Sequence, residues 1–133
     1  MGWLKRMFGR GDVPPFVLPS EADCVTTETG LKHEVVTEGD GATPGPFETV
    51  RVHYAGWLVN GTLFDSSYAR GEPIAFPLNR AIAGWGEGLR LMRVGGTSRF
   101  VIPAELAYGA RGAPPAIGPN ATLVFQVELL DVR

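Results

Sequence analysis

The sequence predicts an α+β domain in which a curved antiparallel β-sheet wraps around one short amphipathic α-helix. Three observations support this prediction. The chain of 133 residues has the size of one domain and can bury a core without disulfides, in keeping with its single cysteine, Cys24. Its 18 glycines and 11 prolines favour short strands joined by many turns. Apolar residues recur at every second position in several segments after residue 30, whereas helical spacing occurs there in one.

The predicted strands begin at residue 31 and are separated by turns rich in glycine and proline. Residues 31–36 alternate with a period of two, which fits a strand with one solvent-exposed face. A loop over residues 39–46 precedes a strand over residues 50–54. The segment 98–102 is a short strand that ends before a proline, and the clearest strand covers residues 122–132. One face of that last strand carries Leu123, Phe125, Val127 and Leu129.

A hairpin is predicted at Asn60-Gly61, which lies between the apolar segments 57–59 and 62–64. Asparagine and glycine both tolerate a positive φ angle, which a tight two-residue turn requires at both central positions. The strands on either side of this turn are therefore expected to pair with each other.

One helix is predicted to interrupt the sheet, with Asn79 as its N-cap. Its apolar stripe has i, i+3 and i+7 spacing and consists of Ile82, Trp85 and Leu89. Three glycines lie inside this stripe, and each costs about 1 kcal/mol relative to alanine. Packing against the sheet, rather than local propensity, must therefore form this helix.

The chain divides near residue 30 into a flexible N-terminal extension, residues 1–30, and a folded domain, residues 31–133. One interpretation of the extension is a small amphipathic anchor for a membrane surface or a partner protein. We favour an extension that packs on its own domain or makes no specific contact, because ten residues are too few for a stable isolated helix. The apolar and basic residues concerned are Trp3, Leu4, Lys5, Arg6, Met7, Phe8 and Arg10.

Charge and composition exclude several functional classes. The net charge of −2 and the pI near 5.6 argue against binding to the phosphate backbone of a nucleic acid. No run of about 18 apolar residues is present that could span a membrane. Basic residues interrupt the N-terminus where a secretory signal needs an apolar run, so a cytoplasmic protein is expected.

The side chains that commonly carry catalysis are sparse. His33 and His53, with one cysteine in the extension, do not form a metal-binding cluster, so no metal or cofactor is expected. Ser66 and Ser67 follow Asp65, and His53 could approach them in space. A hydrolase triad also needs oxyanion donors in a fixed geometry, and we therefore do not favour a hydrolase.

Aromatic residues are instead concentrated between positions 54 and 125. Phe76 and Phe100 fit core positions. Tyr54, Trp85 and Phe125 could equally belong to the core or line an apolar cavity, and composition leaves both alternatives open.

Several sequence blocks occur together in the order found in one known family. They are Val52-His53-Tyr54-Ala55-Gly56, Asn60-Gly61, Phe64-Asp65-Ser66-Ser67, Pro73-Ile74-Ala75-Phe76, Ile82-Ala83-Gly84-Trp85-Gly86-Glu87-Gly88-Leu89, Ile102-Pro103, Ala107-Tyr108-Gly109-Ala110 and Ala121-Thr122-Leu123-Val124-Phe125. In these blocks the chain resembles the FKBP-type peptidyl-prolyl isomerases over residues 31–132, about three quarters of its length. The resemblance implies an antiparallel sheet wrapped on a short helix, in agreement with the pattern above.

The resemblance also implies a proline-binding pocket with Trp85 as its floor. Substrate carbonyls are expected to bind the backbone N–H of Ile82 and the hydroxyl of Tyr108. The walls of the pocket are expected to be Tyr54, Phe64 and Phe125, with Ile74 and Ile82 at the rim.

By the same resemblance, Asp65 is the polar group at the edge of the pocket, and Arg70 orients it. The loop near residue 115 departs from the family pattern, because Ala113 and Ala116 replace a histidine and a large aliphatic residue that many members carry. Ile117 is therefore expected to stand alone at the tip of this flap.

Two functional classes follow from the resemblance. The first is a peptidyl-prolyl cis-trans isomerase that assists protein folding by acting on proline-containing polypeptides. Such a reaction needs neither a nucleophile nor a metal, which suits the sparse catalytic residues. The second is a catalytically weak binding module for a protein partner or a macrolide such as rapamycin. The presence of Tyr54, Phe64, Asp65, Trp85, Tyr108 and Phe125 together favours the enzyme, and a monomer is expected.

Overall fold

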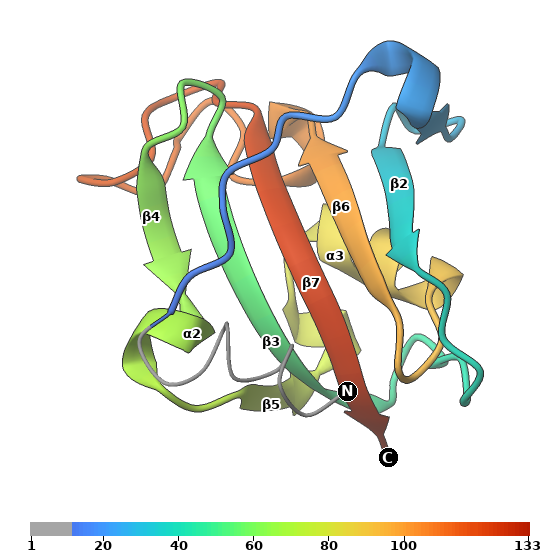
Figure 1. Cartoon of the computed structure of the whole chain (residues 1–133). Coiled ribbons are helices and arrows are strands. Elements are labelled where there is room, and N and C mark those ends of the chain that lie inside the picture. Colours follow the sequence, from blue (N-terminus) through green and yellow to red (C-terminus); the bar gives the residue numbers. More distant parts are fainter. Residues whose placement is uncertain (1–11) are drawn as a thin grey trace.

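The computed structural model describes residues 12–133 and confirms the predicted α+β fold. The predicted anchor residues Trp3, Leu4, Met7 and Phe8 lie outside the described residues. Seven antiparallel strands form one curved sheet in the order β1-β2-β6-β7-β3-β4, with β5 also paired to β3 (Figure 1). The strands are β1 (Val25–Thr26), β2 (Lys32–Thr37), β3 (Thr49–Leu58), β4 (Leu63–Ser66), β5 (Ile74–Pro77), β6 (Thr97–Ile102) and β7 (Leu123–Val132).

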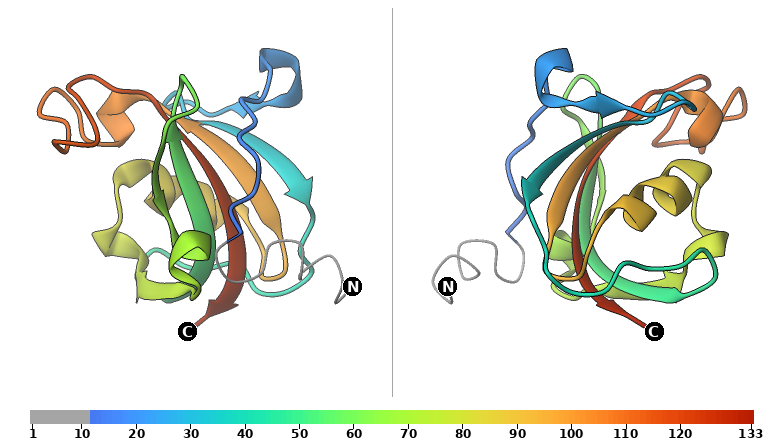
Figure 2. Two further views of the ribbon diagram at one scale, coloured as in Figure 1. Left: turned by 60° about the vertical axis from the view of Figure 1, so that its left-hand side comes forward. Right: turned by 90° about the vertical axis from the view of Figure 1, so that its right-hand side faces the viewer.

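The helices are short. The helical elements are η1 (Glu21–Asp23), α2 (Ser67–Arg70), η2 (Leu78–Arg80), α3 (Ala83–Gly88), η3 (Leu89–Leu91) and η4 (Ala104–Leu106). Helix α3 and its continuation η3 lie across the concave side of the sheet, as the right-hand view of Figure 2 shows. None of the helices in residues 12–133 is long and apolar enough to cross a bilayer.

The long strand β3 pairs with three other strands. Its first half pairs with β5 through residues 49–52, and its second half pairs with β4 through residues 55–57. Its other edge pairs with β7 along nearly the whole strand, with a register shift between Arg51 and Val52. A second shift on the β4 side, between Gly56 and Trp57, adds to the bend, because bulges increase local twist.

The hairpin between β3 and β4 is confirmed, but its turn differs from the prediction. Gly61 has a φ of +91°, whereas Asn60 does not adopt a positive φ. The amide of Leu58 donates to the carbonyl of Thr62 at 2.9 Å, which encloses three residues rather than two. Asn60 contributes through its side chain instead, because its Oδ1 accepts the Thr62 N–H at 3.0 Å.

The predicted helix is present but begins later than expected. The N-cap position is Ile82, and Asn79 lies in the preceding turn η2, so the predicted N-cap is wrong. The glycines explain why the helix can lie so close to the sheet. A Cβ on Gly84 would lie 2.5 Å from Ile102 Cγ2, and one on Gly88 would lie 2.7 Å from Phe100 Cε1.

The two faces of the sheet are covered differently. The concave face and α3 enclose the main core, whose largest fully buried member is Phe100. On the convex face, Val13 and Phe16 pack against a second cluster of Ala55, Trp57, Tyr68 and Val124. The strand β1 pairs with β2 as well. Part of the segment expected to be a flexible extension therefore packs on the domain.

Candidate functional site

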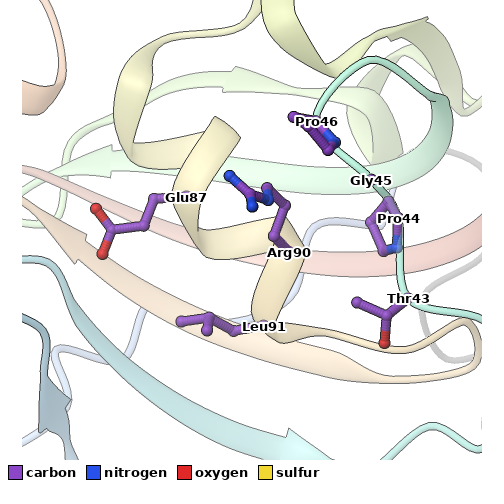
Figure 3. A pocket seen from close by; sticks show the side chains of 7 residues that line it. All are labelled: Thr43, Pro44, Gly45, Pro46, Glu87, Arg90 and Leu91. Carbon is purple, nitrogen blue, oxygen red and sulfur yellow. The ribbon is translucent and has the colours of Figure 1, made fainter.

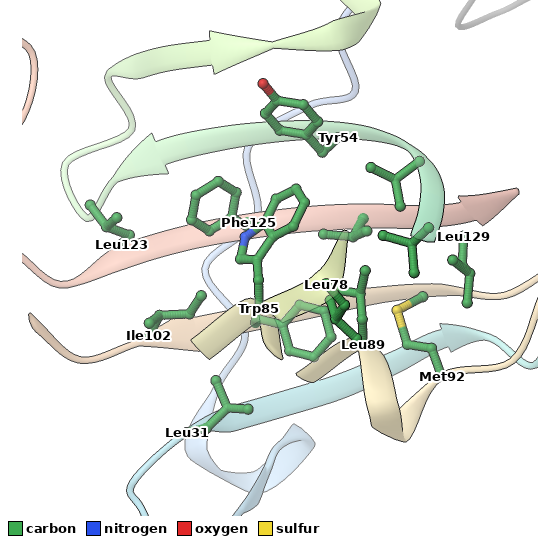
Figure 4. Close-up of a cluster of buried hydrophobic side chains, with 14 of the residues drawn as sticks. Leu31, Tyr54, Leu78, Trp85, Leu89, Met92, Ile102, Leu123, Phe125 and Leu129 are labelled. Atoms are coloured by element: carbon green, nitrogen blue, oxygen red, sulfur yellow. The ribbon is translucent and has the colours of Figure 1, made fainter. Parts of the chain in front are cut away.

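Three aromatic rings from three separate elements meet on the concave face. Tyr54 on β3, Trp85 on α3 and Phe125 on β7 are 95 % or more buried (Figure 4). The Tyr54 and Trp85 rings are 5.2 Å apart between centroids, and so are the Trp85 and Phe125 rings. Both pairs are nearly perpendicular, at 83° and 84°, which is a favoured edge-to-face arrangement. With Phe64, described next, we call these residues the aromatic cluster.

Gly56 brings the fourth ring into this cluster. It pairs with Phe125 across β3 and β7 and with Asp65 across β3 and β4. A Cβ at this position would lie 2.6 Å from Phe125 Cε1 and 2.7 Å from Phe64 Cζ. Without a side chain there, the Phe64 and Phe125 rings approach to 5.5 Å at 90°. The sequence analysis did not single out Gly56 as part of the site, although it lies in one of the family blocks.

The indole of Trp85 carries a buried donor without an acceptor. Its Nε1 makes no hydrogen bond to any group in residues 12–133. Figure 4 shows this nitrogen on the side of the indole toward Phe125. Leaving a donor unpaired in a dry environment is costly.

A polar network adjoins the aromatic cluster. The Tyr54 hydroxyl donates to Oδ2 of Asp65, and Arg70 Nη1 donates to Oδ1 of the same carboxylate at 2.5 Å. Arg70 Nη2 also donates to the Tyr54 hydroxyl oxygen at 2.9 Å, and the guanidinium lies 5.7 Å from the centre of the Tyr54 ring. Tyr54, Asp65 and Arg70 thus hold one another in a closed triangle, as the sequence analysis expected for the last two.

The network keeps Asp65 ionised. Partial burial of Asp65 opposes its charge, but hydrogen bonds from Tyr54 and Arg70 outweigh burial and hold the pKa of the carboxyl below its ordinary value. Burial, together with the neighbouring carboxylate, raises the pKa of Tyr54 to about 12. Near neutral pH the network is therefore a carboxylate that accepts from two donors, which suits orientation better than proton transfer.

The remaining predicted rim residues surround the cluster at different depths. Ile74 and Ile82 are half-buried against it, as is Phe76, whose ring lies 5.5 Å from that of Trp85. The N–H of Ile82 donates to no group within the described part of the chain, which leaves it available to a carbonyl. Ile117, the residue expected at the flap tip, is 96 % buried against the core, and its backbone exchanges hydrogen bonds with that of Ala113.

Tyr108 lies apart from both the aromatic cluster and the polar network. Its side chain is 41 % exposed in the turn that follows η4. The turn is held by hydrogen bonds from Gly109 N to Ala104 O and from Gly112 N to Tyr108 O. The Tyr108 hydroxyl has no hydrogen bond to another residue of the described chain and is free to donate.

His53 and Ser67 come together, but not as a hydrolase site. His53 Nδ1 lies 2.8 Å from Ser67 Oγ on the convex side of the sheet. Ser67 is fully buried, and its Oγ already accepts the backbone N–H of Tyr54 at 2.7 Å. Asp65 is occupied by Tyr54 and Arg70 and does not orient His53 toward the serine.

A separate surface groove lies between the loop before β3 and the end of α3 (Figure 3). None of the predicted site residues belongs to it. Its lining residues are Thr43, Pro44, Gly45, Pro46, Glu87, Arg90 and Leu91.

Residues 41–130 match the family of FKBP-type peptidyl-prolyl cis-trans isomerases. The chain belongs to this family. An FKBP-type 22 kDa isomerase of Escherichia coli strain K12 is 55 % identical to this FKBP-type chain over 107 residues, which are 80 % of this chain and 52 % of the relative.

Solved structures agree with the assignment. The crystal structure of FkpA from Escherichia coli has a TM-score of 0.82 and 51 % identity over 86 % of this chain and 53 % of that one. A peptidyl-prolyl isomerase from Pseudomonas syringae has a TM-score of 0.80 and 36 % identity over 85 % of this chain and 83 % of its own. This FKBP-type chain spans about half the length of the curated relatives it matches.

Proposed function

We propose that this chain is a peptidyl-prolyl cis-trans isomerase that accelerates rotation about X–Pro bonds in polypeptides. The observation that carries the proposal is the aromatic cluster with the carboxylate of Asp65 held beside it by Tyr54 and Arg70. Family membership and relatives named as isomerases at about 50 % identity support it.

The chemistry of rotation suits such a site. The barrier to X–Pro rotation is about 20 kcal/mol and arises from resonance between the carbonyl and the nitrogen. At the top of the barrier this resonance is lost, so the amide is less charge-separated than in its planar form. An apolar surface formed by Trp85 and Phe125 favours the twisted amide over the planar one. A thousandfold acceleration requires about 4 kcal/mol of this preference.

Hydrogen-bond donors near the cluster would hold the flanking peptide. The unpaired N–H of Ile82 and the exposed hydroxyl of Tyr108 are suited to donate hydrogen bonds to substrate carbonyls. Fixing the two carbonyls confines rotation to the bond between them, which lowers the entropic cost of reaching the twisted state. Small residues at Ala113 and Ala116 give the flap few side-chain contacts for selecting the residue before proline.

A protease-coupled isomerisation assay on tetrapeptides that differ before proline tests the proposal. We expect acceleration over the uncatalysed rate that varies little across the series and is inhibited by rapamycin. Leu91→Ala, in the groove of Figure 3, should leave the rate unchanged and serves as the control. A folded chain that binds rapamycin without accelerating rotation would instead be a binding module. Absence of both activities would overturn the proposal.

Two further statements from the sequence stay predictions. Assistance to protein folding follows if the isomerase acts on unfolded chains, and refolding of a substrate limited by proline isomerisation would test it. A monomeric, cytoplasmic protein remains the expectation of the sequence.

A further inference from the structure

The convex face of the sheet is covered by a segment outside the matched family region, which begins at residue 41. Residues 13–17, here called the strap, run from beside α2 across β3 and β7 on the face opposite α3 (Figures 1 and 2). Pro14 of the strap is buried, and Val13 and Phe16 are half-buried. The strap is therefore part of the folded unit.

The strap packs on one cluster of side chains. The Phe16 ring meets Trp57 edge to face, with centroids 5.6 Å apart and an interplanar angle of 62°. It also lies over the hairpin turn, because a Cβ on Gly61 would be 3.4 Å from Phe16 Cδ2. Val13 packs against the same cluster, whose members are Ala55, Trp57, Tyr68 and Val124.

Tyr68 connects this cluster to the polar network. It is the second residue of α2, and Arg70 is the last residue of the same helix. A helix of four residues cannot hold itself together, because a single turn does not repay the cost of nucleation. Its order must therefore come from contacts that its side chains make with the rest of the domain.

Two side chains of α2 make most of its contacts with the domain. Ser67 is fully buried, and its Oγ accepts the N–H of Tyr54 at 2.7 Å and lies 2.8 Å from His53 Nδ1. The Tyr68 hydroxyl donates to Glu128 at 3.2 Å, and the Tyr68 ring stacks on His53 at 4.6 Å on the convex face. Tyr68 is buried against Ala55, Trp57 and Val124. Its side chain therefore makes the main hydrophobic contact of the helix that carries Arg70.

We propose that the strap is a positioning element for Arg70, acting through Tyr68 and α2 to hold the guanidinium against Asp65 and Tyr54. Arg70 is the last residue of α2, whereas Asp65 lies on β4 just before it, so a shift of this helix changes the distance between their charged groups. The Arg70 side chain is 47 % exposed, and its contacts with Asp65 and Tyr54 are made by the guanidinium at its end. An effect of the strap on catalysis rests on the proposed function. Its effect on the position of Arg70 beside Asp65 does not depend on that function.

The test is Phe16→Ala in the full chain, with the titration of the Asp65 carboxyl carbon followed by NMR. Loss of the strap contact should loosen Arg70 and raise the pKa of Asp65 toward its ordinary value. Leu18→Ala is the matched control, because Leu18 is the first apolar residue after the strap and is 50 % exposed. Phe16→Leu should restore the Asp65 titration of the parent chain, and it also supplies a folded variant if alanine is not tolerated.

A background variant separates positioning from general stability. In Arg70→Gln the carboxylate has already lost its cation, so adding Phe16→Ala should change the Asp65 titration no further. If Phe16→Ala lowers the unfolding midpoint but leaves the Asp65 titration unchanged, the strap only covers the sheet and the proposal is wrong. A parent chain without isomerase activity would overturn the proposed function, while the NMR result would still decide the role of the strap.

Discussion

Gly56 and Phe125 face each other across β3 and β7, and the Phe125 ring occupies the space that a side chain on Gly56 would need. The ring of Phe64 closes on the same point from β4. The position of two rings in the candidate site therefore depends on the absence of one methyl group.

Gly56→Ala is expected to destabilise the domain by about 1–3 kcal/mol, because two rigid rings on separate strands must move apart. Urea unfolding measures the change as a lower midpoint. Gly118→Ala is the matched control, since a Cβ there meets nothing within 4 Å. Equal midpoints for the two variants would show that the rings can adapt without cost.

Asp65→Asn should lower kcat/KM by roughly tenfold or less, which is about 1.4 kcal/mol. The amide keeps the size of the carboxylate but loses the charge-assisted bond to Arg70. Asp131→Asn removes another carboxylate paired with an arginine, Arg133, and should leave the rate unchanged. A loss near ten-thousandfold would mean that Asp65 transfers protons. That result would contradict the proposal that the apolar site accelerates rotation by favouring the twisted amide.

Rapamycin binding should change the fluorescence of Trp85. The ring contacts Tyr54, Phe76 and Phe125, so a ligand on the aromatic cluster alters its surroundings. In Trp85→Phe the ligand-induced change should disappear, whereas in Trp57→Phe, on the convex face, it should remain. Survival of the signal in Trp85→Phe would place the ligand elsewhere.

Stability should decrease at acidic pH through His53. Burial lowers the pKa of His53 in the folded state, with Glu128 opposing the shift and Arg51 adding to it. The unfolded chain then binds a proton more readily than the folded one, so stability is complete above pH 6.5 and falls as pH decreases through the lowered pKa. His53→Gln should reduce the slope of unfolding free energy against pH in this range. An unchanged slope would show that His53 does not cause the loss of stability.

A chain that starts at Val25 should fold but unfold more easily than one that starts at Asp12. The shorter chain lacks Val13 and Phe16, whose half-buried side chains shield Trp57, and a loss of about 1–3 kcal/mol is expected. Thermal unfolding of both chains measures it. A shorter chain that does not fold would contradict the domain boundary predicted at residue 30, and equal stabilities would contradict the role given to the strap contacts.

Most of the fold could be predicted because apolar and polar residues alternate along the strands, and this alternation indicates which face of each strand is buried. Alternation in residues 122–132 and around Tyr54 placed the right side chains on the concave face, and the stripe through Trp85 placed a helix against it. The helix start was predicted wrongly because Asn79 is a good N-cap by type, while the chain forms the turn η2 before α3 begins. The residues of the polar network came from the resemblance to the family, and periodicity alone would not have joined Asp65 to Arg70.

The sequence by itself determined the family, the α+β class and the identity of most residues in the aromatic cluster, because these depend on local patterns and on blocks of fixed spacing. Only the tertiary structure decided that the strap covers the convex face, that Ile117 is buried and that Gly56 admits two rings. Such contacts join residues far apart in the chain, and their energies depend on register and burial rather than on neighbours in sequence. Val13 and Phe16 lie in a proline-containing segment without periodicity, so nothing local indicates which surface they cover.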